Sequence, residues 1–370
     1  MRFLRRFFSG FDTWLIGAVL VLLGFGVLAL VSSGLTRGYH EIITQSVAIG
    51  IGLILMFLLS RAHPKTVHSL RHYVALAAVL TLISVLVFGH TVKGTRGWFM
   101  IGPMSLQPVE LAKVALIIVL ASILPLHARS RSFIAVIGAS FMTMVFVGLT
   151  LLQPDFGSAV ILMGLWCAML LVSGVPRRYV VILFIAAVAV GAFSWQFAFK
   201  DYQKERVLIF LDPSRDPLGR GYNVTQAQIA VGSGGLFGSG FASGSQSQLR
   251  FLPESQTDFV FSLIAEELGF IAVILLVSSI GVVVWRLYLL ARRAPDDFSQ
   301  FVAVGGAALI SIESFIAIGG NIGLVPMTGI TLPFVSAGGS SVMAHLALIG
   351  LVQGVSRAAS RTVHTRDSMA

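Results

Sequence analysis

The sequence predicts an all-α membrane protein: a polytopic bundle of ten transmembrane helices with one long extracytoplasmic loop between helices seven and eight. Composition is the first reason. Hydrophobic residues make up 56% of the 370 residues and charged residues only 11%, so lipid must solvate most of the chain. The second reason is that the hydrophobic residues form runs of about 20, the length that a helix needs to cross a hydrocarbon core of about 30 Å.

Each hydrophobic run is expected to be a helix, because a backbone that faces lipid must satisfy its own hydrogen bonds. In chain order, the runs lie at residues 11–31, 40–60, 69–89, 107–126, 132–152, 156–174, 179–199, 259–285, 300–319 and 340–356. We expect a single integral membrane domain over residues 1–370, in which residues 200–257 form the long outer loop and residues 358–370 a short cytoplasmic tail.

Basic residues predict how the bundle is oriented. Arg2, Arg5 and Arg6 precede the first run, and further basic residues gather in every second connection after it. Such residues stay in the cytoplasm, so we expect a multi-pass protein of the cytoplasmic (inner) membrane with both termini cytoplasmic. We therefore interpret the net charge of +10 as a signal that orients the helices and as an attraction to anionic lipids of the inner leaflet. Nucleic-acid binding is not predicted, because the basic residues are scattered over short connections.

The long connection at residues 200–257 is polar, and a loop of this length is usually functional. Within it, the spacing of apolar residues in Tyr222–Val231 predicts a short helix at the outer interface of the bilayer. Gly232–Gln248 is rich in Gly and Ser, which is typical of a flexible linker and also of backbone that approaches a ligand closely. Both interpretations stay open.

Charged residues inside the predicted spans are costly in lipid and are therefore candidate functional residues. Glu110 and Lys113 lie three residues apart, on one helix face, and form either a structural ion pair or part of a polar cavity for an anionic substrate. Glu266 and Glu267 are adjacent, so we expect that they do not face one site and that at least one binds a backbone donor or a basic group. Glu313 has no obvious partner nearby in the sequence.

Two further features lie near the carboxyl end. His345 stands alone in an apolar stretch and is expected to be a satisfied core histidine. No group of His, Cys, Asp and Glu has the spacing of a zinc site, so no metal ligands are predicted. Pro326, Gly329, Pro333 and Gly338 favour either an irregular re-entrant segment or an ordinary tight external loop between the last two spans.

Asp258 lies where the polar outer loop meets the eighth hydrophobic run. We expect Thr257 to cap this helix and Asp258 to fall in its first turn, where the helix dipole favours a carboxylate. An acidic residue at a helix start is common, so the position alone does not separate a structural role from a catalytic one. A carboxylate at the outer mouth of a membrane helix would nevertheless suit chemistry on a lipid-linked substrate.

Six motifs in order resemble one known family. They are KGTRGWFMIG at residues 93–102, QPVELAK at 107–113, QPDFGSA at 153–159, GYNVTQAQIAVGSGGLFGSGF at 221–241, FLPESQTDFVFSLIAEELG at 251–269 and NIGLVPMTGITLPFVSAGGSS at 321–341. Over nearly all of residues 11–357 the chain resembles the SEDS family (shape, elongation, division and sporulation), whose members are polytopic peptidoglycan glycosyltransferases. The amino-acid sequence of the long loop is more similar to that of elongation-type members than to that of division-type members.

The resemblance implies ten helices, a reaction at the outer face, and lipid II as substrate, a disaccharide-pentapeptide on undecaprenyl diphosphate. It also implies a class B penicillin-binding protein (a transpeptidase) and other elongation-complex proteins as partners. Asp258 matches the essential acidic residue of the family, and Glu110 and Lys113 match its buried pair. Val109 stands where the family usually has Ser, and Gly97 follows Arg96 where many elongation members place Arg before the Trp.

On this resemblance, Asp258 is the hypothetical general base that deprotonates the 4-hydroxyl of the acceptor sugar. Lys113, Arg96, Arg206 and Arg220 are candidates for offsetting the charge of the leaving diphosphate, with a divalent cation such as Mg²⁺ or Mn²⁺ as a further option. No other cofactor is implied. Two alternatives remain, a transporter (flippase) of the lipid-linked precursor and a non-catalytic scaffold for cell-wall enzymes.

Overall fold

A computed structural model describes residues 11–367, apart from 38–39, 93, 103, 129–132, 177, 180, 183–184, 186–195, 197–200, 218 and 250. Seven of the described helices are long and apolar enough to cross a membrane. These are α2 (Thr13–Arg37), α3 (His40–Arg61), α5 (Arg71–Phe88), α7 (Phe133–Leu152), α13 (Val260–Arg292), α14 (Asp297–Asn321) and α15 (Gly339–Asp367). The chain is thus a predominantly helical, multi-pass membrane protein.

Two more helices match predicted spans. α6 (Pro108–Ala128) corresponds to the fourth run, and α8 (Phe156–Val172), a shorter apolar helix, corresponds to the sixth. The seventh run, 179–199, lies largely outside the described residues, so the count of ten spans stays a prediction.

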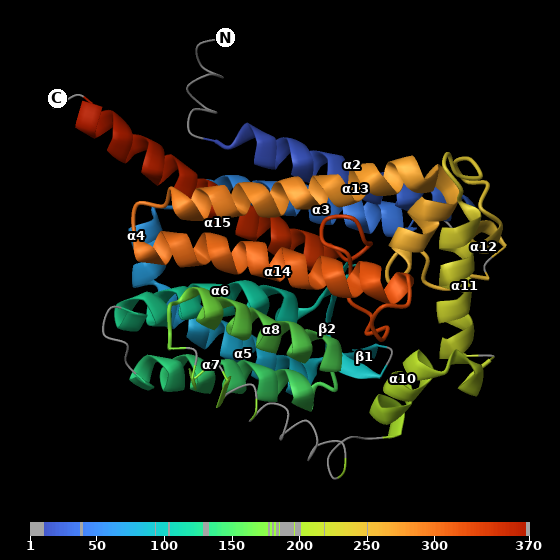
Figure 1. The fold of residues 1–370 in the computed structure, drawn as a ribbon, viewed down its shortest axis with the longest axis horizontal. Coiled ribbons are helices and arrows are strands. Elements are labelled where there is room, and N and C mark those ends of the chain that lie inside the picture. Colours follow the sequence, from blue (N-terminus) through green and yellow to red (C-terminus); the bar gives the residue numbers. More distant parts are fainter. Residues whose placement is uncertain are drawn as a thin grey trace.

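The helices run side by side along the long axis of the molecule (Figure 1). α15 packs along α3, α13 packs along both α14 and α2, and α6 packs between α5, α7 and α14. The beginning of α2 and the end of α15 lie at the end of the bundle where α4 (Pro64–Ser69) connects α3 to α5 (Figure 1). Large apolar side chains such as Phe88, Ile134 and Leu58 are exposed on the outside of the bundle, as a lipid-facing surface requires.

The prediction of a wholly α-helical fold is wrong between α5 and α6. Three short strands, β1 (His90–Val92), β2 (Thr95–Ile101) and β3 (Met104–Leu106), form an antiparallel sheet in the order β1-β2-β3. Gly94 and Gly102 have φ of 84° and 60° at the two turns, a conformation that glycine adopts without steric cost. Because strands this short carry almost no periodicity, the hydrophobic pattern could not reveal them.

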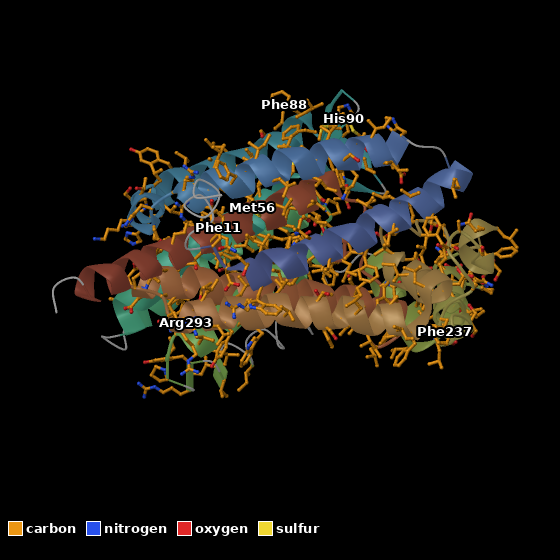
Figure 2. The ribbon with its side chains drawn as sticks, turned by 90° about the horizontal axis from the view of Figure 1, so that it is seen from above. Phe11, Met56, Phe88, His90, Phe237 and Arg293 are labelled. Carbon is orange, nitrogen blue, oxygen red and sulfur yellow. The ribbon has the colours of Figure 1, made fainter. Side chains whose placement is uncertain are left out.

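Helices also occupy the long connection before α13. They are α10 (Asp201–Leu211), a short 3₁₀ turn (Pro213–Arg215), α11 (Arg220–Ser233) and α12 (Ser245–Gln248). The helix predicted at Tyr222–Val231 is therefore confirmed. α10 to α12 lie at the opposite end of the bundle from α4, together with the small sheet (Figure 1). In Figure 2, Phe237 lies toward this end and Arg293, just after α13, toward the other.

The connection between α14 and α15, residues 322–338, folds back into the bundle. Leu332, Phe334, Val335 and Ser336 are buried, and the backbone of Val335 lies against Gly26 of α2. A Cβ added at Gly26 would lie only 2.6 Å from the carbonyl oxygen of Val335. This burial fits the re-entrant interpretation and does not fit a tight external loop.

Candidate functional site

Asp258 lies in a turn just before α13, and not in the first turn of that helix. α13 begins at Val260 with Phe259 as the flanking residue, so the predicted cap by Thr257 is wrong. The reason is that the hydroxyl of Thr257 donates backwards, to the carbonyl oxygen of Glu254 at 3.3 Å and to its carboxylate at 3.0 Å. Asp258 is half-buried at this position.

The re-entrant connection forms one wall of this site. The backbone N–H of Ala337 donates to the carbonyl oxygen of Gln256 at 2.8 Å. A Cβ added at Gly329 would lie 3.6 Å from Oδ2 of Asp258, so glycine there leaves space beside the carboxylate. Residues 256–258 and 329–337 are therefore in direct contact although they lie in separate motifs of the chain.

The same end of the bundle joins two further motifs to the start of α15. Ser340, at the start of α15, accepts from the backbone N–H of Gln107 at 2.8 Å and donates to the carbonyl oxygen of Ser105 at 3.0 Å. The side chain of Gln107 donates to Asp155 at 3.2 Å, and Asp155 caps α8 by accepting from the N–H of Ser158. The motifs at 107–113, 153–159 and 321–341 thus meet around the sheet.

Glu110 and Lys113 form the predicted ion pair, with 2.8 Å between Lys113 Nζ and Glu110 Oε1. The structure adds Glu313, which the sequence left without a partner, at 2.7 Å from the same ammonium. Nε2 of His345 lies 2.5 Å from the other oxygen of Glu313. These four side chains, hereafter the charge network, are each at most 8% exposed.

This geometry favours the structural interpretation of the Glu110–Lys113 pair, because the ammonium already binds two carboxylates. A contact between Lys113 and a substrate stays a prediction, as does the substrate role of Glu110. His345 is confirmed as a satisfied core histidine, since its Nδ1 also lies 2.7 Å from the carbonyl oxygen of Ser341.

The predicted arginines lie apart from the charge network. Arg96, in β2, donates to the carbonyl oxygens of Val87 at 2.9 Å and Gly89 at 3.2 Å, and so holds the end of α5. Arg206 lies in α10 and Arg220 begins α11, but their side chains fall outside the described residues. Binding of the leaving diphosphate by these arginines stays a prediction.

Among the residues that the structure describes, no group of three or more His, Cys, Asp and Glu side chains is placed to hold a metal ion. A divalent cation at the site therefore stays a hypothesis.

Glu266 binds the first turn of α12 and Glu267 binds the glycine-rich connection before it, roles that the sequence did not reveal. Glu266 accepts from the backbone N–H groups of Gln246 at 2.7 Å and Ser247 at 3.1 Å. Glu267 accepts from the hydroxyl of Ser32 in α2 at 2.6 Å and from the N–H of Ala242 at 3.1 Å. The expectation that a backbone donor satisfies at least one of them is confirmed, whereas the expectation that they point to different places is wrong.

A break in α13 follows these two glutamates. Gly269 has φ of 77° and ψ of −175°, which only glycine adopts readily. The carbonyl oxygens of Glu266 and Glu267 instead accept from the N–H groups of Ser239 and Gly240, at 2.9 and 3.1 Å. In return the N–H of Phe270 donates to the carbonyl oxygen of Gly235 at 2.9 Å. Residues 234–240 are thus ordered packing for a broken helix, and not a flexible linker.

An apolar groove of about 800 Å³ runs between α8, α13 and α14. It extends from Trp285 and Tyr288 to Ile322 and Leu324. Ile322 directly follows Asn321, whose side-chain amide donates to the carbonyl oxygen of Asp258 at 2.9 Å. A surface suited to a lipid chain therefore ends one residue from the side chain that binds the backbone of Asp258.

Comparison with known proteins identifies the family. The model of the cell cycle protein family that groups FtsW, RodA and SpoVE matches residues 8–361. The chain belongs to this family. The matched region includes Asp258, the charge network and the re-entrant connection.

Individual members are similar over most of the chain. The probable peptidoglycan glycosyltransferase FtsW of Thiomicrospira cyclica is 36% identical, over 93% of this chain and 91% of that protein. The peptidoglycan glycosyltransferase MrdB of Escherichia coli K12 is 33% identical, over 83% of each chain.

Two solved structures share the fold. One, from a peptidoglycan synthase complex that coordinates polymerization and crosslinking, has a TM-score of 0.80 and 35% identity over 94% of this chain and 98% of that chain. The rod shape-determining protein RodA of Thermus thermophilus has a TM-score of 0.68 and 30% identity over 94% of this chain and 97% of that chain.

Proposed function

We propose that this chain is a peptidoglycan glycosyltransferase that polymerises lipid II at the outer face of the cytoplasmic membrane, with Asp258 as general base. The observation that carries the proposal is the position of Asp258: it is a half-buried acidic residue in a turn just before a broken membrane helix, and its backbone is bound by Asn321, which directly precedes a residue of the apolar groove. Relatives named peptidoglycan glycosyltransferases, similar over 83% or more of this chain, support the assignment.

The reaction joins two lipid-linked chains. The carboxylate of Asp258 accepts the proton of the acceptor sugar 4-hydroxyl as that oxygen attacks the anomeric carbon of the donor. A bond forms between this oxygen and the anomeric carbon, and the bond from that carbon to the diphosphate oxygen breaks. Undecaprenyl diphosphate leaves with the electron pair, and the configuration inverts. Outer-loop arginines, with Arg96, offset the charge of the leaving group.

The topology proposed for this reaction has both termini in the cytoplasm and the α10–α12 end outside. The start of α2 and the end of α15 lie at one end of the bundle while α11 and the sheet lie at the other, which is consistent with this arrangement (Figure 1). We place the chain with elongation-type members, which act with a class B penicillin-binding protein and other elongation-complex proteins. The similarity to a chain of a synthase complex supports a partner of this kind.

The test uses the purified full chain with a class B penicillin-binding protein in proteoliposomes that contain lipid II. Asp258→Asn should lower the initial rate of glycan polymerisation by about 10²- to 10⁴-fold, the usual contribution of a general base. Asp212→Asn, which changes an exposed carboxylate of the same outer region, should leave the rate unchanged. Polymer made at the normal rate by Asp258→Asn would exclude the general-base role.

The same vesicles separate the transporter alternative. A flippase would move labelled lipid II between leaflets without forming polymer, and its movement would not depend on Asp258. The absence of polymer with every partner, combined with transbilayer movement of lipid II, would favour transport over polymerisation.

A further inference from the structure

Two buried side chains hold the backbone on either side of the Asp258 side chain. The amide Nδ2 of Asn321, the last residue of α14, donates to the carbonyl oxygen of Asp258 at 2.9 Å. The hydroxyl of Ser336, in the re-entrant connection, donates to the carbonyl oxygen of Thr257 at 2.7 Å. Both side chains are 1% exposed, so water does not compete for these hydrogen bonds.

Asn321 connects the Asp258 turn to two helices. Its Nδ2 also donates to the carbonyl oxygen of Ala317 in α14 at 2.8 Å. Its Oδ1 accepts from the hydroxyl of Ser262 in α13 at 2.7 Å and from the N–H of the same residue at 3.3 Å. Both amide hydrogens and both acceptor positions are thus used, which fixes the orientation of the amide.

Ser336 connects the same turn to α3. Its hydroxyl oxygen accepts from the N–H of Leu332 at 2.8 Å, and its carbonyl oxygen accepts from the amide of Gln45 at 3.3 Å. Because the hydroxyl has a single hydrogen, donation to Thr257 and acceptance from Leu332 set its rotamer. The carbonyls of Thr257 and Asp258 are therefore held from opposite ends of the re-entrant connection.

These bonds matter because no regular helix fixes Asp258. The residue lies two positions before Val260, where α13 begins. The N–H of Phe259 closes its turn with a long hydrogen bond of 3.3 Å to the carbonyl oxygen of Glu254. A peptide carbonyl fixed on each side restricts the backbone dihedral angles that aim the carboxylate. Gly329 then leaves the space beside Oδ2 that an acceptor hydroxyl would need.

We propose that Asn321 and Ser336 are positioning residues that aim the Asp258 carboxylate at the acceptor hydroxyl. The inference rests on the proposed general-base role of Asp258. Neither side chain is placed to touch the substrate, because both are buried behind the backbone of the turn. They act on catalysis through the position of Asp258, and a displacement of about 1 Å can cost about 10²-fold in rate.

The chain offers a matched control at the opposite end of the bundle. Gln353 is 0% exposed, and its amide binds the peptide of Asp12 by accepting from the N–H at 2.8 Å and donating to the carbonyl oxygen at 3.2 Å. Gln353→Ala removes a buried amide from a peptide group, as Asn321→Ala does, but far from Asp258.

The experiment measures kcat and KM for lipid II polymerisation, together with the thermal unfolding midpoint of each variant with its partner in proteoliposomes. Asn321→Ala should lower kcat by about 10²-fold and change KM by less than about threefold. Asn321→Asp should have the same effect, because it turns a carboxylate oxygen toward two carbonyl oxygens. Ser336→Ala should lower kcat by about tenfold, and Ser336→Thr, which keeps the hydroxyl, should restore most of it. Gln353→Ala should lower the unfolding midpoint and leave kcat unchanged.

Three results decide the outcome. A normal kcat in folded Asn321→Ala and Ser336→Ala, while Asp258→Asn is inactive, overturns the positioning role and leaves the general base intact. Polymerisation at the normal rate by Asp258→Asn overturns the proposed general-base role instead. If the Asn321 variants do not fold, Ser336→Ala, which removes one oxygen atom, carries the test: the kcat loss and the Ser336→Thr rescue support positioning, and their absence contradicts it.

Discussion

Two regions of this molecule neutralise buried carboxylates by different means. In the middle of the bundle, Glu110 and Glu313 bind the ammonium of Lys113. At the break in α13, Glu266 and Glu267 bind hydroxyls, a side-chain amide and backbone N–H groups. No cation is recorded against this second pair within the described part of the chain.

The difference follows from what each backbone can offer. Lys113 and Glu313 lie inside the continuous helices α6 and α14, where backbone N–H groups bond within the helix, so the buried carboxylate of Glu313 needs a side chain of opposite charge. Gln246 and Ser247 lie in the first turn of α12, and Ala242 lies in the irregular connection before it, so their N–H groups are free to stabilise a carboxylate without a counter-ion. A charge network thus fixes helices to one another, whereas a cluster of donors fixes a loop to a helix.

The largest expected effect comes from removing the cation. Lys113→Met leaves Glu110 and Glu313 buried without their ammonium, which should cost about 3 to 5 kcal/mol of unfolding free energy. Chemical denaturation in detergent micelles, followed by helical circular dichroism, measures the loss. The double variant Glu110→Gln, Lys113→Met removes one of the stranded charges and should recover part of it. A single variant as stable as the parent would show that the network contributes no net stability.

A smaller and more local effect is expected at the α13 break. Glu267→Gln keeps the shape but loses the charge, and its new NH₂ group faces donors such as the hydroxyl of Ser32 and the amide of Gln248. The expected cost is about 1 to 3 kcal/mol. Hydrogen exchange should accelerate at residues 239–248 and not in α6 or α14. Uniform acceleration over the whole bundle would mean that the two regions are not energetically separate.

The smallest effect is expected for a carboxylate in water. Asp212 is exposed, and a hydrogen bond from the hydroxyl of Ser214 holds the pKa of its carboxyl below the ordinary value. A lowered pKa stabilises the fold above the unfolded-state pKa and loses that contribution as pH falls through the folded-state pKa. Asp212→Asn should therefore leave the thermal midpoint at pH 7 almost unchanged, and the curves of the two proteins should converge below about pH 4. A large difference at pH 7 would contradict this assignment.

The sequence predicted the elements that local periodicity encodes. Long apolar runs located α3 and α14 to within three residues at each end, and the spacing of Glu110 and Lys113 placed them on one helix face. These features depend on residues a few positions apart.

The features that the sequence did not predict depend on distant contacts. Lys113 and Glu313 are separated by 200 positions, so nothing local marks them as partners. Thr257 has the chemistry of a helix cap, yet Glu254 offers it a competing acceptor within the preceding turn. Family resemblance singled out Asp258, whereas the hydrogen bonds of Asn321 and Ser336 to its turn appear only in three dimensions.

The break at Gly269 also constrains the order in which this end of the protein is assembled. The backbone groups of residues 235–240 and 266–271 complete each other, and a Cβ at Gly234, Gly238 or Gly269 would collide with backbone atoms at 2.2 Å or less. The glycine-rich connection is synthesised first, and its backbone N–H and carbonyl groups lack these hydrogen-bond partners until α13 packs beside it. Biogenesis of the two segments is therefore a single event, in which neither reaches its native hydrogen bonding alone.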